Sequence, residues 1–352
     1  MTNTPFDSVL LIAFGGPQGP ADVRPFLENV LRGRRVAPER IDEVAQHYQI
    51  FGGVSPITEL TRRQARGLQD RLDAAGLSLP VHVGMRNWRP LLTDTLAEMS
   101  RAGLRRAIGF IAAPHRSYSS CTQYRENVAA ARGALRAAGL PDVEVTYVSD
   151  WHTHPGFIAA MVANVVSALE RLPDALHSRA RLIFTAHSIP MSMAERYPYR
   201  EQFEDSVRLV MDHVRRETGV DRGWATVYQS RSGRPEDPWL GPDVCDYLRA
   251  EGARGLAAAV LCPIGFVCDH VEVLYDLDIE AAAVCRDVAM AMTRAAAVND
   301  EPRFLDMMAD VVIHTFRQYS RGRALPLAPA TTAAADSTSY GRHAPIGGAV
   351  KL

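Results

Sequence analysis

The stretch Arg181-Leu-Ile-Phe-Thr-Ala-His-Ser-Ile-Pro190 contains the pattern that decides the fold. Its apolar run, over 181–186, is short and ends at His187, with Pro190 closing the loop that follows. Such runs are typical of strands buried in a parallel sheet. Comparable runs lie at 8–14, 81–85, 106–112, 143–148, 225–229 and 255–262, and helical patterns lie between them at 57–75, 91–102, 122–138, 202–217 and 243–250. This alternation predicts an α/β fold in which helices cover both faces of parallel sheets.

The alternating segments form two series that meet near residue 150. Two doubly wound domains are therefore predicted, over 1–150 and 151–300, with a cleft between them at the carboxyl ends of the strands. A last helical pattern predicts that 301–320 is a helix packing back on these domains. The remaining residues, 321–352, are rich in alanine, proline, serine, threonine and glycine and lack periodicity, which predicts a disordered tail.

The composition is that of an ordinary globular protein, and it excludes several enzyme classes. Of 352 residues, 47% are apolar and 22% are charged, with a formal net charge of −1. A near-neutral chain carries no general polyanion-binding face, so nucleic acid is not an expected partner. Lys351 is the only lysine, and its place beside the C-terminus excludes a P-loop lysine and a Schiff-base lysine.

Cysteine usage and hydropathy predict a cytoplasmic protein. The five cysteines are an odd number scattered along the chain, which favours reduced thiols. The apolar run at 8–14 has no basic residue before it, so it indicates a first strand rather than a signal peptide. Runs of about eighteen apolar residues are absent, which predicts that the protein has no transmembrane helix.

Two loops near the N-terminus each allow a structural and a functional interpretation. In Gly15-Gly-Pro-Gln-Gly-Pro20 the glycine spacing differs from a dinucleotide-binding loop and the prolines remove amide donors, so a tight strand-to-helix turn is favoured. Arg32-Gly-Arg-Arg35 is either a solvated surface turn or a clamp for carboxylates, which match the guanidinium fork.

His187 lies at the carboxyl end of its predicted strand, at the edge where clefts open in parallel sheets. The proline that follows sets the loop and would hold the imidazole in one direction. The residues alone leave two interpretations open, a satisfied structural histidine or a functional one.

The segment Pro263-Ile-Gly-Phe-Val-Cys-Asp-His-Val-Glu-Val-Leu-Tyr-Asp-Leu-Asp-Ile-Glu280 is the richest in chemistry. A helix is predicted to begin close to Asp269, with that residue as its N-cap. Glu272, Asp276 and Glu280 recur every four residues, and each step advances only about 40° around an α-helix, so the three share one stripe. The stripe is either a solvated face or a site where a divalent cation offsets the repulsion between carboxylates.

The candidate zinc ligands in and near this segment do not have the spacing that known zinc sites require. His270-Val-Glu272 matches half of a zinc deaminase signature, but no P-C-x-x-C follows it. Cys262, Cys268 and Cys285 are not spaced as zinc ligands, so they are interpreted as structural thiols.

Taken together, these segments resemble the ferrochelatase family, whose members insert Fe²⁺ into a porphyrin. The resemblance covers the chain apart from its tail. Its most specific pieces are Phe184-Thr-Ala-His-Ser-Ile-Pro190 and Pro263-Ile-Gly-Phe-Val-Cys-Asp-His-Val-Glu-Val-Leu-Tyr-Asp276. The supporting pieces are Phe14-Gly-Gly-Pro17, Gly52-Gly-Val-Ser-Pro-Ile57, Gln229-Ser-Arg-Ser-Gly233 and Asp237-Pro-Trp-Leu-Gly-Pro-Asp243. The family has two Rossmann-like domains with a porphyrin cleft between them, in agreement with the predicted architecture.

The resemblance implies a role for each candidate residue. His187 and Glu272 become the facing catalytic pair that handles the metal, and Asp276 with Glu280 extends it as an acidic conduit for the ion. The residues implied in porphyrin binding are Ser55, Tyr124, Arg32, Arg34 and Phe14, the two arginines as partners of the propionates. Which of His187 and Glu272 takes each proton stays open.

The implied substrate is coproporphyrin III, because the overall pattern is similar to the soluble Gram-positive-type enzymes that convert it to coproheme. The alternatives are a protoporphyrin IX ferrochelatase, a cobalt chelatase, and a non-enzymatic carrier of tetrapyrrole or metal. Three positions depart from such enzymes. Phe14 replaces a tyrosine that serves several of them as axial ligand, Asn87 replaces a histidine, and His47 replaces a propionate-binding arginine.

The resemblance implies no tightly bound cofactor, with Fe²⁺ as a substrate. Some relatives hold a [2Fe-2S] cluster through cysteines of a C-terminal extension. No cysteine follows Cys285 in this chain, so no such cluster is predicted. The implied partners are the porphyrin and Fe²⁺, for a monomer that hands its product to the next heme-pathway enzyme.

Overall fold

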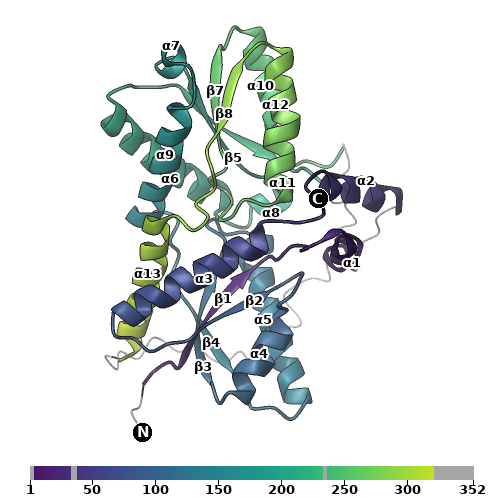
Figure 1. Ribbon diagram of the computed structural model, residues 1–352, viewed down its shortest axis with the longest axis vertical. Coiled ribbons are helices and arrows are strands. Elements are labelled where there is room, and N and C mark those ends of the chain that lie inside the picture. Colours follow the sequence, from purple (N-terminus) through teal and green to yellow (C-terminus); the bar gives the residue numbers. More distant parts are fainter. Residues whose placement is uncertain (1–3, 33–37, 233–235, 321–352) are drawn as a thin grey trace.

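The computed structural model describes residues 4–32, 38–232 and 236–320 and contains two four-stranded parallel sheets (Figure 1). The strand orders are β2-β1-β3-β4 and β6-β5-β7-β8, so the same arrangement of strands occurs twice along the chain. The strands are β1 (Ser8–Ala13), β2 (Val81–Met85), β3 (Arg106–Ile111), β4 (Glu144–Tyr147), β5 (Arg181–His187), β6 (Trp224–Gln229), β7 (Ala258–Cys262) and β8 (Ala291–Arg294). The predicted α/β fold with two Rossmann-like parallel sheets is confirmed.

Helices flank each sheet, and two short π-helical segments interrupt the regular pattern. The α-helices are α1 (Pro20–Val30), α2 (Pro38–Ile50), α3 (Ile57–Ala74), α4 (Leu92–Arg101), α5 (Gln123–Ala137), α6 (Pro155–Leu169), α7 (Asp174–His177), α8 (Met191–Ala194), α9 (Tyr199–Thr218), α10 (Val244–Ala253), α11 (Val271–Val273), α12 (Ala282–Asp287) and α13 (Pro302–Ser320). The π-helices are η1 (Tyr118–Thr122) and η2 (Leu274–Ala281).

The two-residue period of the strands sorts their side chains between separate cores. In β1, Val9 and Leu11 belong to a central core, whereas Leu10 and Ile12 belong to an outer core that includes residues of α4 and α5. Strand β5 repeats the division, with Phe184 in the central core and Ile183 in a second outer core shared with α10 and η2. Both faces of each sheet are therefore buried, which explains the nearly continuous apolar runs in the sequence.

The central core is common to both sheets, and α13 lies across it. Near its start α13 places Phe304 against Trp151, with ring centroids 5.8 Å apart, and near its end Tyr319 lies 4.9 Å from Phe6. Residues of both sheets and of α13 share this one core. The domain bounds 1–150 and 151–300, and the assignment of 301–320 as a helix packing on both domains, stay predictions. The predicted tail, 321–352, lies outside the described residues.

Several elements have no counterpart in the sequence prediction. Helix α6 contributes most of its side chains to the central core, so its sequence lacks the polar face from which an amphipathic helix is recognised. Strand β8 is a four-residue edge strand of half-buried side chains, without an apolar run. Within the described ranges, no helix has the length and apolar character needed to cross a membrane.

Candidate active site

The end of β5 fixes the backbone of His187 from several sides. The strand extends one residue beyond the predicted run, so that His187 pairs with Gln229 at the end of β6. The hydroxyl of Tyr199 donates to the His187 carbonyl at 3.0 Å. The loop after β7 crosses directly behind this strand, because a Cβ atom on Gly265 would lie 2.6 Å from the Ala186 Cα atom. Only glycine permits so close an approach, which explains the Pro-x-Gly turn.

Hydrogen bonding determines which nitrogen of His187 faces the site. Nδ1 lies 2.5 Å from the Ser188 carbonyl oxygen, which can only accept, so Nδ1 carries a hydrogen. The other ring nitrogen, Nε2, lies 3.3 Å from Glu272 Oε1. The two side chains predicted to face each other therefore do so, one from the end of β5 and one from α11.

Helix α11 starts later than predicted, and Asp269 is not its N-cap. The cap position is His270, and Glu272 is the second residue of the helix. The Asp269 carboxylate instead accepts hydrogen bonds from Arg294 at 2.8 Å and from Asn299 at 2.9 Å. A long-range charge-assisted contact has displaced the local capping interaction that sequence reasoning assumed.

The Glu272 carboxylate is buried with one oxygen lacking a hydrogen-bond donor. Its Oε2 atom lies 3.5 Å from His270 Nε2. Although Oε1 lies within ion-pair distance of His187, the contact does not satisfy hydrogen-bond geometry, and among the described residues no donor serves this atom. A buried carboxylate oxygen without a donor normally costs free energy, so the arrangement leaves a position for an external cation or proton.

The pKa values of the pair move in opposite directions. Burial alone would lower the pKa of His187, but the charge of Glu272, the contact with it, the Ser188 carbonyl and the charge of Asp276 together raise it above its ordinary value. Burial would raise the pKa of Glu272, but the charges and contacts of His187 and His270 hold it below its ordinary range. Both shifts favour the charged forms of the pair, an imidazolium and a carboxylate.

Two of the three carboxylates in the predicted stripe lie on a π-helix, whereas Glu272 lies on α11 just before it. Segment η2, with i→i+5 backbone bonds, carries Asp276 and Glu280, and π-helical turns are frequent at functional sites. Burial, followed by the negative charge of Glu272, raises the pKa of Asp276 to about 7, and the charge of Glu280 adds to the effect. The three carboxylates therefore remain electrostatic neighbours, although the helix geometry differs.

Asp276 is held by two residues at the end of β6 that sequence reasoning did not assign. Its Oδ2 atom accepts a hydrogen bond from Gln229 Nε2 at 3.2 Å and another from the Ser230 hydroxyl. Ser230 has a φ angle of 60°, an uncommon conformation for a residue other than glycine, and such strain is found at functional sites. The position of this Gln-Ser pair directly after a buried strand is the signal that could have identified it.

A narrow pocket opens onto this cluster between the two halves of the molecule. One wall is Val44, His47 and Tyr48 of α2, and the other is Val271, Glu272, Tyr275 and Asp276. Figure 1 shows α2 beside α11, where the halves meet. The His47 ring stacks on the Tyr275 ring at 3.6 Å with an angle of 10° between the planes. Glu272 and Asp276 thus face the junction, where a cleft was predicted.

None of the predicted porphyrin-binding residues that the structure describes lines this pocket. Ser55 is buried, and its amide donates to the Pro17 carbonyl at 2.9 Å. Tyr124 is buried below the Arg86 guanidinium, 5.7 Å from its ring, and burial raises the pKa of Tyr124 to about 12.

Phe14 and Arg32, also in this set, lie beside α1. Phe14 packs edge-on against Phe26 at 6.3 Å, and Arg32 is exposed just beyond the helix. Arg34 lies outside the described residues. Of the four described residues, Phe14, Arg32, Ser55 and Tyr124, none makes a hydrogen bond or ion pair to His187 or Glu272 within the described ranges.

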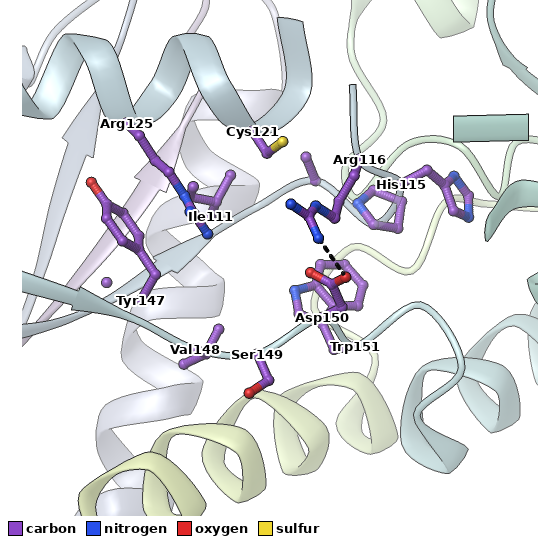
Figure 2. Close-up of a pocket in the computed structure, with 13 residues that line it drawn as sticks. Ile111, His115, Arg116, Cys121, Arg125, Tyr147, Val148, Ser149, Asp150 and Trp151 are labelled. Carbon is purple, nitrogen blue, oxygen red and sulfur yellow. Dashed lines mark hydrogen bonds and ion pairs between the residues drawn. The ribbon is translucent and has the colours of Figure 1, made fainter. Parts of the chain in front are cut away.

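A separate pocket lies at the carboxyl ends of β3 and β4 (Figure 2). Figure 2 shows Arg116 directed toward Asp150, at 3.4 Å, and Arg125 beside Tyr147, with the guanidinium 4.7 Å from the ring centroid. No predicted site residue within the described ranges lines this pocket. Its arginines are already engaged by a carboxylate and an aromatic face, so it is distinct from the His187–Glu272 site.

The described part of the chain contains no group of three or more histidine, cysteine or acidic side chains arranged to hold a metal ion. The cysteines are free, and burial raises the pKa of Cys268 to about 12 and of Cys285 to about 11. These thiols are protonated near neutral pH and pack as apolar groups.

A model of the ferrochelatase family matches residues 7–316, which include the described site. The chain belongs to the ferrochelatase family. It is accordingly a porphyrin metal chelatase, an enzyme class of heme biosynthesis.

Two curated relatives in this family match most of the chain. The coproporphyrin III ferrochelatase of Streptomyces griseus subsp. griseus is 47% identical over 331 residues, covering 91% of this chain and 88% of the relative. A ferrochelatase of Rhodopirellula baltica is 48% identical over 309 residues, covering 88% and 86%. A solved structure of SirB from Bacillus subtilis with Fe³⁺ has a TM-score of 0.53 at 10% identity, covering 90% of this chain and 97% of that one. It therefore shares the fold.

Proposed function

We propose that the protein inserts Fe²⁺ into coproporphyrin III to give coproheme, with release of two protons. The observation that carries the proposal is the half-buried His187–Glu272 pair, with Nε2 and Oε1 only 3.3 Å apart and Oε1 without a hydrogen-bond donor among the described residues. Relatives named coproporphyrin III ferrochelatase in two Streptomyces species, each 47% identical, support the choice of porphyrin.

In the proposed reaction His187 accepts a pyrrole proton. The Ser188 carbonyl keeps the hydrogen of the imidazole on Nδ1, so Nε2 is the nitrogen that exchanges protons at the site. Because the negative charge of Glu272 raises the pKa of His187, an arriving Fe²⁺ that neutralises this charge lowers that pKa and releases Nε2 as a base. Metal arrival and base activation are thereby coupled, and general-base catalysis of this kind typically contributes about 10²–10⁴-fold to a rate.

Glu272, Asp276 and Glu280 form the proposed route for the ion. Carboxylate oxygens and imidazole nitrogens are suitable ligands for Fe²⁺. Asp276, with its pKa raised to about 7, is partly protonated at neutral pH and can exchange its proton for the metal. Glu280 is half-buried at the end of η2 away from Glu272, and it would attract the ion first.

The porphyrin is proposed to lie at the junction of the two halves, contacted by Phe14, Ser55 and Tyr124. Arg32 and Arg34 would pair with the propionates, since guanidinium groups bind carboxylates in bidentate geometry. Closure of such a site around the macrocycle would favour a distorted ring, whose exposed nitrogen lone pairs resemble the transition state.

Anaerobic incubation of the purified protein with Fe²⁺ and either coproporphyrin III or protoporphyrin IX, followed by visible absorption, tests this function. We expect rapid metallation of coproporphyrin III and slow metallation of protoporphyrin IX. A preference for protoporphyrin IX would keep the chelatase and overturn the substrate. Faster insertion of Co²⁺ than of Fe²⁺ would indicate a cobalt chelatase, and binding of both porphyrins without metallation would indicate a carrier.

We further propose a cytoplasmic monomer without a [2Fe-2S] cluster that passes coproheme to the next heme-pathway enzyme. The free, largely buried cysteines support a reducing compartment. Light scattering on the purified protein tests the oligomeric state. Iron and sulfide analysis tests the cluster, since two iron atoms and two sulfides per chain would overturn that expectation.

A further inference from the structure

Arg294 links two parts of the segment that carries the proposed metal ligands. It is the last residue of β8, and its side chain is only 15% exposed. Nη1 donates to Asp269 Oδ1 at 2.8 Å, three residues before Glu272. Nε donates to Asp278 Oδ1 at 2.8 Å, in η2 between Asp276 and Glu280. A single guanidinium therefore connects the loop before α11 to the middle of η2.

Asp269 is held as firmly from the other side. Asn299 donates to its Oδ2 atom at 2.9 Å and accepts from its backbone amide at 2.8 Å. Asn299 has a φ angle of 47°, and its carbonyl accepts a hydrogen bond from Gln64 of α3 at 2.6 Å. The Arg294–Asp269–Asn299 cluster therefore connects the metal-handling segment of one half of the molecule to a helix of the other half.

The π-helix needs such support for two physical reasons. A π-helix is rare compared with an α-helix and occurs mostly as single turns, so contacts with other elements are expected to favour its register. Its acidic residues also repel one another, and a buried guanidinium offsets part of this repulsion through charge-assisted hydrogen bonds. Loss of Arg294 removes the positive charge that faces Asp269 and Asp278, beside Glu272 and Asp276, and leaves Asp269 with the neutral donor Asn299.

We propose that Arg294 is a positioning residue for iron insertion: it holds α11 and η2 in the register that places Glu272 Oε1 3.3 Å from His187 Nε2. The proposal rests on the proposed function of the His187–Glu272 pair. Arg294 does not contact the reacting atoms, and it acts through the two aspartates that it joins. A lysine at this position supplies one point charge in place of the planar fork and cannot bridge both carboxylates in the same way.

The test compares Arg294→Gln, Arg294→Lys and Asp278→Asn with the matched control Arg181→Gln. Arg181 is the first residue of β5, at the amino end of a strand in the same sheet, and it pairs with Glu251 and donates to the Tyr247 hydroxyl at 3.1 Å. The control therefore removes a comparable arginine–carboxylate contact at the amino ends of the strands, away from Glu272. Rates are measured with whichever porphyrin the wild-type protein metallates faster, so an incorrect porphyrin assignment leaves the comparison intact.

We expect Arg294→Gln to lower kcat/KM for Fe²⁺ by about tenfold to a hundredfold, the range that a small misplacement of a reacting group produces. The Kd for the porphyrin should stay within about twofold of the wild-type value, since the porphyrin contacts lie elsewhere. Arg294→Lys should recover part of the loss, and Asp278→Asn, which leaves the Asp269 bond intact, should lose less than Arg294→Gln. Arg181→Gln should keep kcat/KM for Fe²⁺.

Binding of Co²⁺ to the metal-free protein, followed by visible absorption, supplies a readout that does not depend on turnover. Affinity should fall in Arg294→Gln and not in Arg181→Gln. Equal kcat/KM and equal Co²⁺ affinity in these two variants would overturn the proposal. If Arg294→Gln does not fold, an Asp278→Asn variant with wild-type values would overturn it instead. A wild-type protein that binds Co²⁺ but metallates neither porphyrin would contradict the proposed function, and the Co²⁺ comparison would still decide the role of Arg294.

Discussion

His187 Nε2 and Glu272 Oε1 face each other at a distance of 3.3 Å, although the two residues are 85 positions apart in the sequence. His187 ends β5, and Glu272 lies at the start of α11. The two elements are not neighbours along the chain, so local interactions do not bring them together. The contact arises because β5 and β7 are neighbouring parallel strands, and the loop after β7 crosses behind β5 at Gly265. The carboxyl ends of parallel strands meet at one edge of the sheet, so residues that follow them converge.

The first prediction concerns the base. His187→Ala should lower the rate of metallation by at least about a hundredfold, because it removes the nitrogen that faces Glu272. Porphyrin binding should persist, as measured by fluorescence titration. His213→Ala changes an exposed histidine on α9 and should behave as wild type. Retained metallation in His187→Ala would contradict the assignment.

The second prediction is that the contribution of the His187–Glu272 pair to the stability of the fold depends on pH. The pKa of Glu272 lies below its ordinary value of 4.5, so its contribution is present above that pH and is lost as the pH falls toward the folded-state pKa. The pKa of His187 lies above its ordinary value of 6.5, so its contribution is full below that pH and is lost as the pH rises through the raised pKa. The pair therefore stabilises the fold most between these limits.

Glu272→Gln should accordingly lower the free energy of unfolding more at about pH 5.5 than at about pH 9. We expect the free energy of unfolding to fall by about 1–3 kcal/mol at the lower pH. This loss is smaller than the usual effect of breaking a fully buried pair, because the His187 side chain is 32% exposed. Denaturant unfolding at both pH values measures it, with the exposed Glu217→Gln on α9 as the control. An equal loss at both pH values would show that the pair does not titrate as described.

The third prediction concerns Asp276, whose pKa is raised to about 7 by burial and by the charge of Glu272. Between its ordinary value of 3.8 and about 7 the unfolded chain loses this proton while the folded protein keeps it. Stability therefore falls with pH across this interval, by at most about 1.4 kcal/mol per pH unit. Asp276→Asn should gain stability relative to wild type from about pH 4 to pH 7 and then level off. A pH series of unfolding curves with a constant difference would contradict the raised pKa.

The fourth prediction concerns delivery of the ion. Glu280→Gln removes one negative charge beyond Asp276, so the KM for Fe²⁺ should rise about threefold to tenfold through loss of local cation attraction. The kcat value and the KM for porphyrin should be retained. Glu217→Gln serves again as the matched control. An unchanged dependence of rate on iron concentration would count against the conduit.

The fifth prediction concerns the placement of Ser55. A Cβ atom on Gly16 would lie 2.6 Å from Ser55 Cβ, so Gly16→Ala must displace Ser55. We expect the KM for porphyrin to rise about fivefold and the free energy of unfolding to fall by about 1–3 kcal/mol, as for an overpacked contact. Gly19→Ala is the control, because a Cβ atom there meets no atom within 4 Å. Equal porphyrin KM values in the two variants would remove Ser55 from the binding surface.

The sequence by itself determined the strand–helix alternation and most of the strands. Short apolar runs such as 106–112 identify strands because both sheet faces are buried, and β3 occupies Arg106–Ile111. The position of His187 at a strand end and the spacing of the three carboxylates were also readable, since both are local properties of the chain. Helix α6 was not predicted, because burial over most of its surface removes the amphipathic pattern.

Only the tertiary structure decided how the site is assembled. The π-helical form of η2, the Ser230–Asp276 hydrogen bond and the use of Asp269 by Arg294 all depend on partners from other elements. Local rules predicted an α-helix capped by Asp269, but a buried arginine from β8 competes for that carboxylate with a stronger charge-assisted bond. Sequence patterns report the preferences of each segment, whereas the register and partners of the acidic residues follow from which strands become neighbours.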